Sequence, residues 1–111
     1  MVLALAALLS VSAMGIAQKI YSVGNEYQAD VNVFVTDKEY RADLIVFKTD
    51  KEYRVDAKAN NGIWYFTTQP YRADKKIYFT DKEYRADLII YFTDKEYRAG
   101  WKDVSKKYLL Y

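Results

Sequence analysis

The sequence of 111 residues contains no cysteine, no histidine and a single proline. Without histidine and cysteine, the chain lacks the most frequent general base, the thiol nucleophile and the usual transition-metal ligands. Without cysteine, no disulfide can stabilise it, although small exported domains often depend on disulfides. The 17 basic and 15 acidic residues give a net charge of +2. This balance is too even to predict binding to nucleic acid or to an anionic membrane surface.

Serine chemistry also has little support in the sequence. Only Ser22 and Ser105 lie outside the apolar N-terminal segment, and neither stands in a nucleophile-elbow motif. The sequence therefore predicts a protein that is not an enzyme and that holds no cofactor. A hydrolase that uses carboxylates alone, such as a glycosidase, is the remaining enzymatic alternative.

Residues 1–17 form an uncharged apolar segment, which is too short to span a bilayer comfortably, since spanning takes about 20 residues. Small residues near its end favour signal-peptidase cleavage before Gln18, with Ala13 as a second candidate, although no Lys or Arg precedes the segment. We expect a signal helix at 1–17, one domain at 18–111, and a secreted or periplasmic protein. An uncleaved membrane anchor or an N-terminal hydrophobic strand is the alternative.

One phrase, T-D-K-E-Y-R-A-D, recurs six times along the rest of the chain. The copies are identical or nearly so at 36–43, 49–56, 80–87 and 93–100, and looser at 23–30 and 67–74. Its tyrosine recurs every 13 residues with one interval of 18, at Tyr27, Tyr40, Tyr53, Tyr71, Tyr84 and Tyr97. Such repetition indicates a repeated structural unit, because a catalytic site needs different residues that converge once.

Between the repeated phrases, the chain alternates with the period of a β-strand. In residues 27–36, one side carries the apolar series Tyr27, Ala29, Val31, Val33 and Val35. Residues 84–93 show the same two faces, and no stretch after the N-terminal segment keeps a helical period. The prediction is an all-β chain of short strands, each unit having about nine extended residues followed by a corner.

The interval of 13 residues requires a turn in every repeat, because an unbroken strand would place equivalent residues on alternate faces. Thr-Asp-Lys-Glu is the predicted corner, since Thr36 and Asp37 can accept hydrogen bonds from nearby backbone N–H groups. The spacing Thr-x-x-Glu also matches a capping box, which would start a single helical turn there. A calcium loop of Asp37, Glu39 and Asp43 is the functional alternative. Basic residues are interleaved with these acids and no glycine follows them, so no metal site is predicted.

Most repeats also place an arginine two residues before an aspartate, as in Arg41 and Asp43. When copies lie side by side, we expect these pairs to form ladders of charge-assisted bonds that set the register of the sheet.

A second aromatic series precedes the repeat tyrosines by six residues. Its members are Tyr21, Phe34, Phe47, Tyr65, Tyr78 and Tyr91. Both series are predicted to pack in the core, because a small chain without disulfides needs that apolar area inside. The alternative is an exposed stripe of tyrosines that binds sugar rings or a protein partner.

The repeat is interrupted once, by five additional residues within 57–63. The dipeptide Asn61-Gly62 is a tight-turn signal and predicts a short projecting hairpin. Asn60, Asn61, Gly62 and Trp64 are therefore the candidates for a unique binding surface. The alternative is a tolerated loop insertion with Trp64 filling the core.

The tandem Y-R-A-D and T-D-K-E-Y copies, followed by Gly100-Trp101 and by S-K-K-Y-L-L-Y at 105–111, resemble the septoil-knot domain family of small bacterial proteins of unknown function. The likeness covers residues 21–111. It implies a chain wound twice round a closed ring of short β segments, with a deeply knotted, seven-crossing backbone. The family brings no catalytic residues to carry over.

The predicted function is that of an exported, stable, monomeric and non-enzymatic repeat domain, which acts structurally or binds a protein or a cell-surface polymer. The alternatives are a carbohydrate-binding module that uses exposed aromatic residues, and a carboxylate-dependent hydrolase. No nucleic-acid partner is expected, and a membrane only through an uncleaved signal. The exposure of Tyr40, Tyr53 and Tyr84 discriminates between these readings, because burial would remove the sugar-binding platform.

Overall fold

The computed structural model describes residues 16–56 and 58–111. Most of the predicted signal helix at 1–17 therefore lies outside the described residues. Within the described ranges, no helix has the length and apolar character needed to cross a membrane.

The described chain alternates short β-strands with single turns of 3₁₀ helix. The strands are β1 (Gln18–Ser22), β2 (Val31–Val35), β3 (Leu44–Lys48), β4 (Ile63–Phe66), β5 (Lys75–Phe79), β6 (Leu88–Phe92) and β7 (Gly100–Trp101). The 3₁₀ turns are η1 (Glu26–Gln28), η2 (Glu39–Arg41), η3 (Glu52–Arg54), η4 (Pro70–Arg72), η5 (Glu83–Arg85), η6 (Glu96–Arg98) and the longer η7 (Val104–Leu110).

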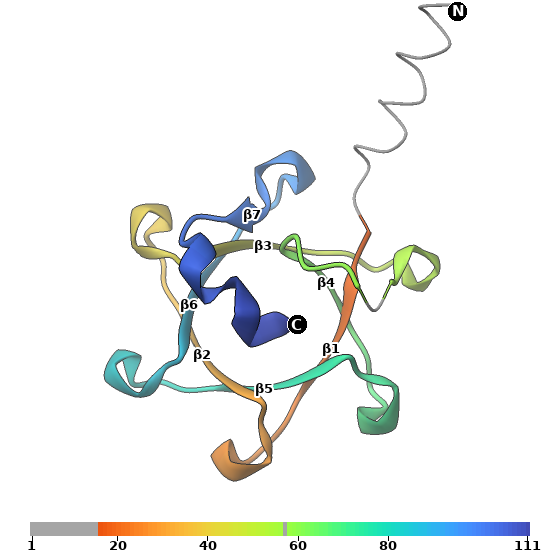
Figure 1. The fold of residues 1–111 in the computed structure, drawn as a ribbon, viewed down its shortest axis with the longest axis horizontal. Helices are drawn as coiled ribbons and strands as arrows, with labels where there is room; N and C mark the ends of the chain where they lie inside the picture. Colours follow the sequence, from red (N-terminus) through yellow and green to blue (C-terminus); the bar gives the residue numbers. More distant parts are fainter. Residues whose placement is uncertain (1–15, 57) are drawn as a thin grey trace, which may run out of the picture.

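Six of the strands close into one parallel ring. Their order is β4-β1-β5-β2-β6-β3, and a further pairing of β3 with β4 closes the circle (Figure 1). The strands of the first lap, β1 to β3, alternate with those of the second lap, β4 to β6. The predicted closed ring of repeats, wound twice, is confirmed. The short strand β7 pairs antiparallel with β3.

The strands are shorter than predicted, because each corner takes more of the repeat. Most strands have five residues, and the 3₁₀ turn covers Glu-Tyr-Arg. The predicted turn-forming threonine is present, since Thr36 Oγ1 accepts a hydrogen bond from the Lys38 N–H at 3.1 Å. The predicted capping box is not formed, because Lys38 is the N-cap residue of η2 and no side chain makes a capping hydrogen bond.

The repeated aspartates hold neighbouring strands together. The carboxylate of Asp43 accepts the backbone N–H of Ile89 at 2.9 Å, and the Asp43 N–H donates to the Ile89 carbonyl at 2.7 Å. Asp30, Asp74 and Asp87 make the same carboxylate contact with the strand beside them. The predicted Arg–Asp ladder is therefore wrong, because the aspartates bind backbone and the arginines bind glutamates.

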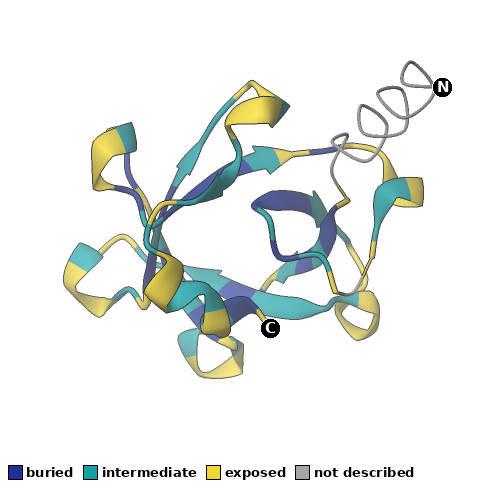
Figure 2. Ribbon diagram, turned by 45° about the horizontal axis from the view of Figure 1, so that its top comes forward, coloured by how far each residue is buried: buried dark blue, intermediate teal, exposed yellow. Residues whose placement is uncertain are grey.

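One face of the ring strands and the C-terminal helix η7 form the hydrophobic core. Its buried members are Ile20, Val31, Val33, Leu44, Val46, Trp64, Ile77, Leu88, Ile90 and Leu110. Burial follows the predicted alternation on the strands, whereas the corners are largely exposed (Figure 2). Helix η7 crosses the ring in Figure 1, and Gln18 Nε2 donates to the Leu110 carbonyl at 2.7 Å. The C-terminal segment therefore plugs the ring.

Candidate functional site

The repeat tyrosines are the most exposed large side chains of the ring. Each lies at the centre of a 3₁₀ corner, and their exposed fractions run from 75% at Tyr40 to 84% at Tyr27. The prediction that this series packs in the core is wrong. The 3₁₀ turn removes these tyrosines from the strand alternation, so that their rings point away from the sheet.

The second aromatic series has a different environment. Tyr21, Phe34, Phe47, Tyr65, Tyr78 and Tyr91 are half-buried. They alternate with the fully buried core positions along each strand, so that they lie on the opposite face of the sheet. None of the six belongs to the described hydrophobic core or packs against it, so the prediction that this series packs in the core is also wrong.

Five ion pairs join the corners, and we call them the corner ion-pair ring. In each pair, the arginine of one corner binds the glutamate of the next corner round the ring, although the two are distant in sequence. The pairs are Arg41–Glu83, Arg85–Glu26, Arg72–Glu52, Arg54–Glu96 and Arg98–Glu39. The pairs lie between successive tyrosines and hold the corners in fixed positions.

The pairs differ in burial, which predicts unequal contributions to stability. Arg54 binds Glu96 through two nitrogens at 2.8 and 2.6 Å, and its side chain is 13% exposed. Arg41 makes one contact with Glu83, and its side chain is 46% exposed. We expect Arg54→Met to lower the free energy of unfolding by about 1.5–3 kcal/mol. The matched variant Arg41→Met should lower it by about 0–1 kcal/mol. Urea denaturation measures both, and equal losses would contradict this ranking.

The four residues predicted to form a unique surface lie mostly inside the molecule. Trp64 is fully buried in the core, and Asn60 and Gly62 are also buried. Asn61 is half-buried, and its Oδ1 accepts the Ile63 N–H at 3.2 Å. The described part of the insertion forms no strand pair with itself, so the predicted projecting hairpin is wrong. The binding role predicted for these residues gains no support from their burial.

Asn60 instead links the insertion to the C-terminal segment. Its Nδ2 donates to the Lys107 carbonyl at 2.9 Å. Its backbone carbonyl and its Oδ1 both accept the Trp101 indole N–H, each at 3.1 Å. The insertion thus helps to hold the plug in place, and the sequence carried no signal for this contact.

The carboxylates considered for a calcium loop do not converge. Asp43 binds backbone and Lys106, Glu39 pairs with Arg98, and Asp37 is exposed. Among the residues that the structure describes, no group of three or more acidic side chains is placed to hold a metal ion.

Comparison with known proteins places the chain in a family. Searches of curated proteins and of solved structures found no match. The sequence model of one family, described as the 7(1) septoil knot domain, matches residues 17–102. This range spans all six corners and every strand of the closed ring. The twice-wound ring, its six corners and this match together show that the chain belongs to the septoil knot domain family.

Proposed function

We propose that this protein is an exported, non-enzymatic binding domain whose six corner tyrosines hold a repetitive cell-surface polymer, with a carbohydrate polymer favoured. The observation that carries the proposal is the rim of tyrosines, each at least 75% exposed on a rigid corner. The phenol ring has an apolar face that suits the C–H face of a sugar ring, and a hydroxyl that remains in water. Six rings exposed on the corners of a small domain bury little apolar area and contribute little to stability.

The surroundings of the tyrosines favour a polar, repetitive ligand over an apolar protein surface. The Arg–Glu pairs between successive corners provide hydrogen-bond donors and acceptors beside each ring. One tyrosine offers a weak contact, whereas several on one rigid body bind a repeating polymer together. Such multivalency raises the overall affinity by about 10²–10⁴-fold without new contacts.

The proposal of a non-enzymatic role is supported by what the repeats do with their carboxylates. The chain has neither histidine nor cysteine. The glutamates of five corners pair with arginines, and four of the repeated aspartates accept backbone N–H groups. These groups are thus engaged in the architecture. A carboxylate hydrolase would need one acid in a different environment from its copies.

We also propose that the two interleaved laps form the knot that the family's description names. The alternation of first-lap and second-lap strands and the plugging of the ring by η7 support this proposal. A knotted chain must be unthreaded before it can unfold completely. Slow unfolding of this kind would protect an exported protein from proteolysis without any disulfide.

The binding proposal predicts a loss of polymer binding when the corner tyrosines are removed. We expect substitution of all six by serine to lower retention on insoluble chitin, cellulose or purified cell-wall sacculi by about 100-fold or more. A single Tyr40→Ser should lower it only a few-fold. The control substitutes the half-buried Tyr65, Tyr78 and Tyr91 by phenylalanine and should retain binding. Undiminished retention by the folded six-fold variant would refute the proposal.

The proposal of export predicts a cleavage point different from the first candidate. Ala17 is fully buried, its N–H donates to the Arg54 carbonyl at 2.9 Å, and its carbonyl accepts the Asp56 N–H at 2.8 Å. Cleavage before Gln18 would remove these bonds. We therefore expect cleavage at the second candidate, after Ala13, and N-terminal sequencing of the exported protein checks it. A mature chain that begins at Gln18 would contradict this expectation.

A further inference from the structure

The corner ion-pair ring is open at one of its six junctions. Between η1 and η4, the position of the arginine is taken by Gln28 and that of the glutamate by Pro70. These corners come from the two loosest copies of the repeat, at 23–30 and 67–74. The two copies are far apart in sequence, but the winding of the chain places their corners side by side (Figure 1).

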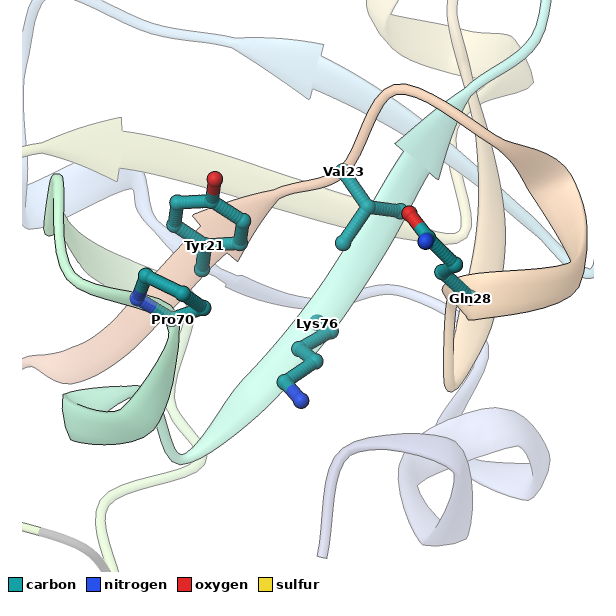
Figure 3. A pocket seen from close by; sticks show the side chains of 5 residues that line it. All are labelled: Tyr21, Val23, Gln28, Pro70 and Lys76. Carbon is teal, nitrogen blue, oxygen red and sulfur yellow. The ribbon is translucent and has the colours of Figure 1, made fainter.

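A pocket lies at this open junction. It has a volume of about 470 Å³ and is lined by Tyr21, Val23, Gln28, Pro70 and Lys76. Figure 3 shows Tyr21 and Pro70 on one side of Lys76, with Val23 and Gln28 on the other. A volume of this size lies in the range of pockets that bind small molecules, which is roughly 300–1,000 Å³.

Lys76 has a free cationic group in this pocket. Its backbone N–H binds Asp30, but its ammonium group makes no ion pair or hydrogen bond within the described parts of the chain. Asn32 occupies the same repeat position at the next junction, where its side chain donates to Glu26 and Arg85 pairs with that glutamate. At the open junction, Pro70 stands where the other corners have this glutamate, so that the Lys76 ammonium group has no acceptor among the described residues.

The other polar groups of the pocket are free in the same sense. Neither the Gln28 amide nor the Tyr21 hydroxyl has a side-chain hydrogen bond to any described residue. The apolar lining comes from the buried Val23, the Pro70 ring and the half-buried Tyr21 ring. No acidic side chain lines the pocket. Its chemistry therefore favours a ligand with one anionic group and one flat or cyclic apolar part.

We propose that this junction pocket binds a small ring-bearing carboxylate. The carboxylate pairs with the Lys76 ammonium group in a charge-assisted hydrogen bond, as the missing glutamate would have done. The ring of the ligand lies against Tyr21 and Pro70, and the Gln28 amide binds a polar substituent. Aromatic acids and sugar acids share this chemistry. The site is separate from the corner tyrosines and does not depend on the proposed polymer binding.

The experiment titrates the full chain with two acids and their neutral counterparts, and follows backbone amides by ¹H–¹⁵N correlation spectroscopy. The probes are benzoate against benzamide, and galacturonate against galactose. We expect at least one acid, and neither neutral compound, to shift the amides of Val23, Gln28 and Lys76. Binding of benzoate would indicate an aromatic ring in the ligand, and binding of galacturonate a sugar ring. Absence of shifts with both acids at about 10 mM would overturn the proposal. It would mean that the dissociation constant exceeds about 10 mM, which is too weak for a dedicated site.

Two variants and one control locate the binding. Lys76→Gln should weaken the binding of the acid at least ten-fold, whereas Lys82→Gln, at an exposed corner lysine, should leave it unchanged. The double variant Gln28→Arg with Pro70→Glu restores the sixth ion pair, fills the junction and should abolish binding. Equal affinity in the Lys76→Gln variant would also overturn the proposal, even if the double variant fails to fold.

The same variants separate this proposal from the proposed function. The chain without its six corner tyrosines should still bind the small acid, and Lys76→Gln should still be retained on the polymer. Failure of one proposal therefore leaves the other unaffected.

Discussion

Replacement of Gly62 by alanine is expected to destabilise the fold by about 3 kcal/mol or more. Gly62 has a φ of +86°, a conformation that L side chains rarely adopt. A Cβ atom there would lie 2.5 Å from the Ile45 carbonyl oxygen and 2.9 Å from the Gly100 nitrogen. Both obstacles are backbone atoms, one in β3 and one in β7, so that neither can rotate away. The substitution therefore forces the backbones of β3 and β7 away from Gly62.

Thermal unfolding measures this effect, and Gly24→Ala is the matched control. In a domain of this size, a loss of 3 kcal/mol lowers Tm by about 15 °C or more. Gly24 has no positive φ, and a Cβ there would meet no atom within 4 Å. Gly24→Ala should change stability by less than about 1 kcal/mol and with a stabilising tendency. Similar Tm values for the two variants would contradict the steric argument.

Trp64→Ala should lower the free energy of unfolding by about 3–5 kcal/mol. Trp64 is the largest fully buried side chain of the described core, and it contacts Phe66 edge-to-face with ring centroids 5.9 Å apart. Phe66 in turn stacks on Phe79. Removal of the indole leaves a cavity that the ring cannot easily close by contracting, because each of the six ring strands is paired on both sides.

The comparison with Trp64→Phe separates packing from hydrogen bonding. The indole Nε1 of Trp64 is buried and has no hydrogen-bond partner among the described residues. Phenylalanine removes this unpaired donor and keeps an aromatic ring against Phe66, so its cost should be about 1–2 kcal/mol. Urea denaturation of both variants provides the test. A phenylalanine variant as unstable as the alanine variant would mean that shape alone determines the cost.

The period-two alternation of the repeat predicts the short strands and their buried face, whereas the closed, twice-wound ring was implied by the resemblance to the septoil-knot family. Leu88 and Ile90, for example, lie on the predicted apolar face and are fully buried. The orientation of the tyrosines could not be predicted in the same way. The alternation that places Val31 and Val33 in the core also predicts a buried Tyr27, but the 3₁₀ turn interrupts the alternation there. Local turn geometry overrode a hydrophobic pattern.

The candidate sites show a second limit of the sequence. Gln28 and Pro70 are visible in the sequence as departures from the repeat. Together they leave one junction without an ion pair, but only because η1 and η4 are neighbours in the ring. This proximity follows from the winding of the chain and cannot be seen in the sequence. Trp64 and Asn60 stand outside the repeat, but the sequence does not show that Trp64 lies in the core and that Asn60 binds the C-terminal segment. In a ring of this kind, the neighbours of a residue come mainly from the other lap.

The alternation of laps also has a consequence for synthesis. None of β1, β2 and β3 pairs with another of these three, and each forms its ladders only with β4 to β7. Apart from the isolated bridge between Ala17 and Val55, the half of the chain that leaves the ribosome first therefore has no strand partner until the later half follows it. Because contacts distant in sequence form slowly, we expect the strands of the first lap to remain unpaired until the second lap has been synthesised. Such a delay in folding would suit passage through a narrow secretion channel, which the proposed export requires.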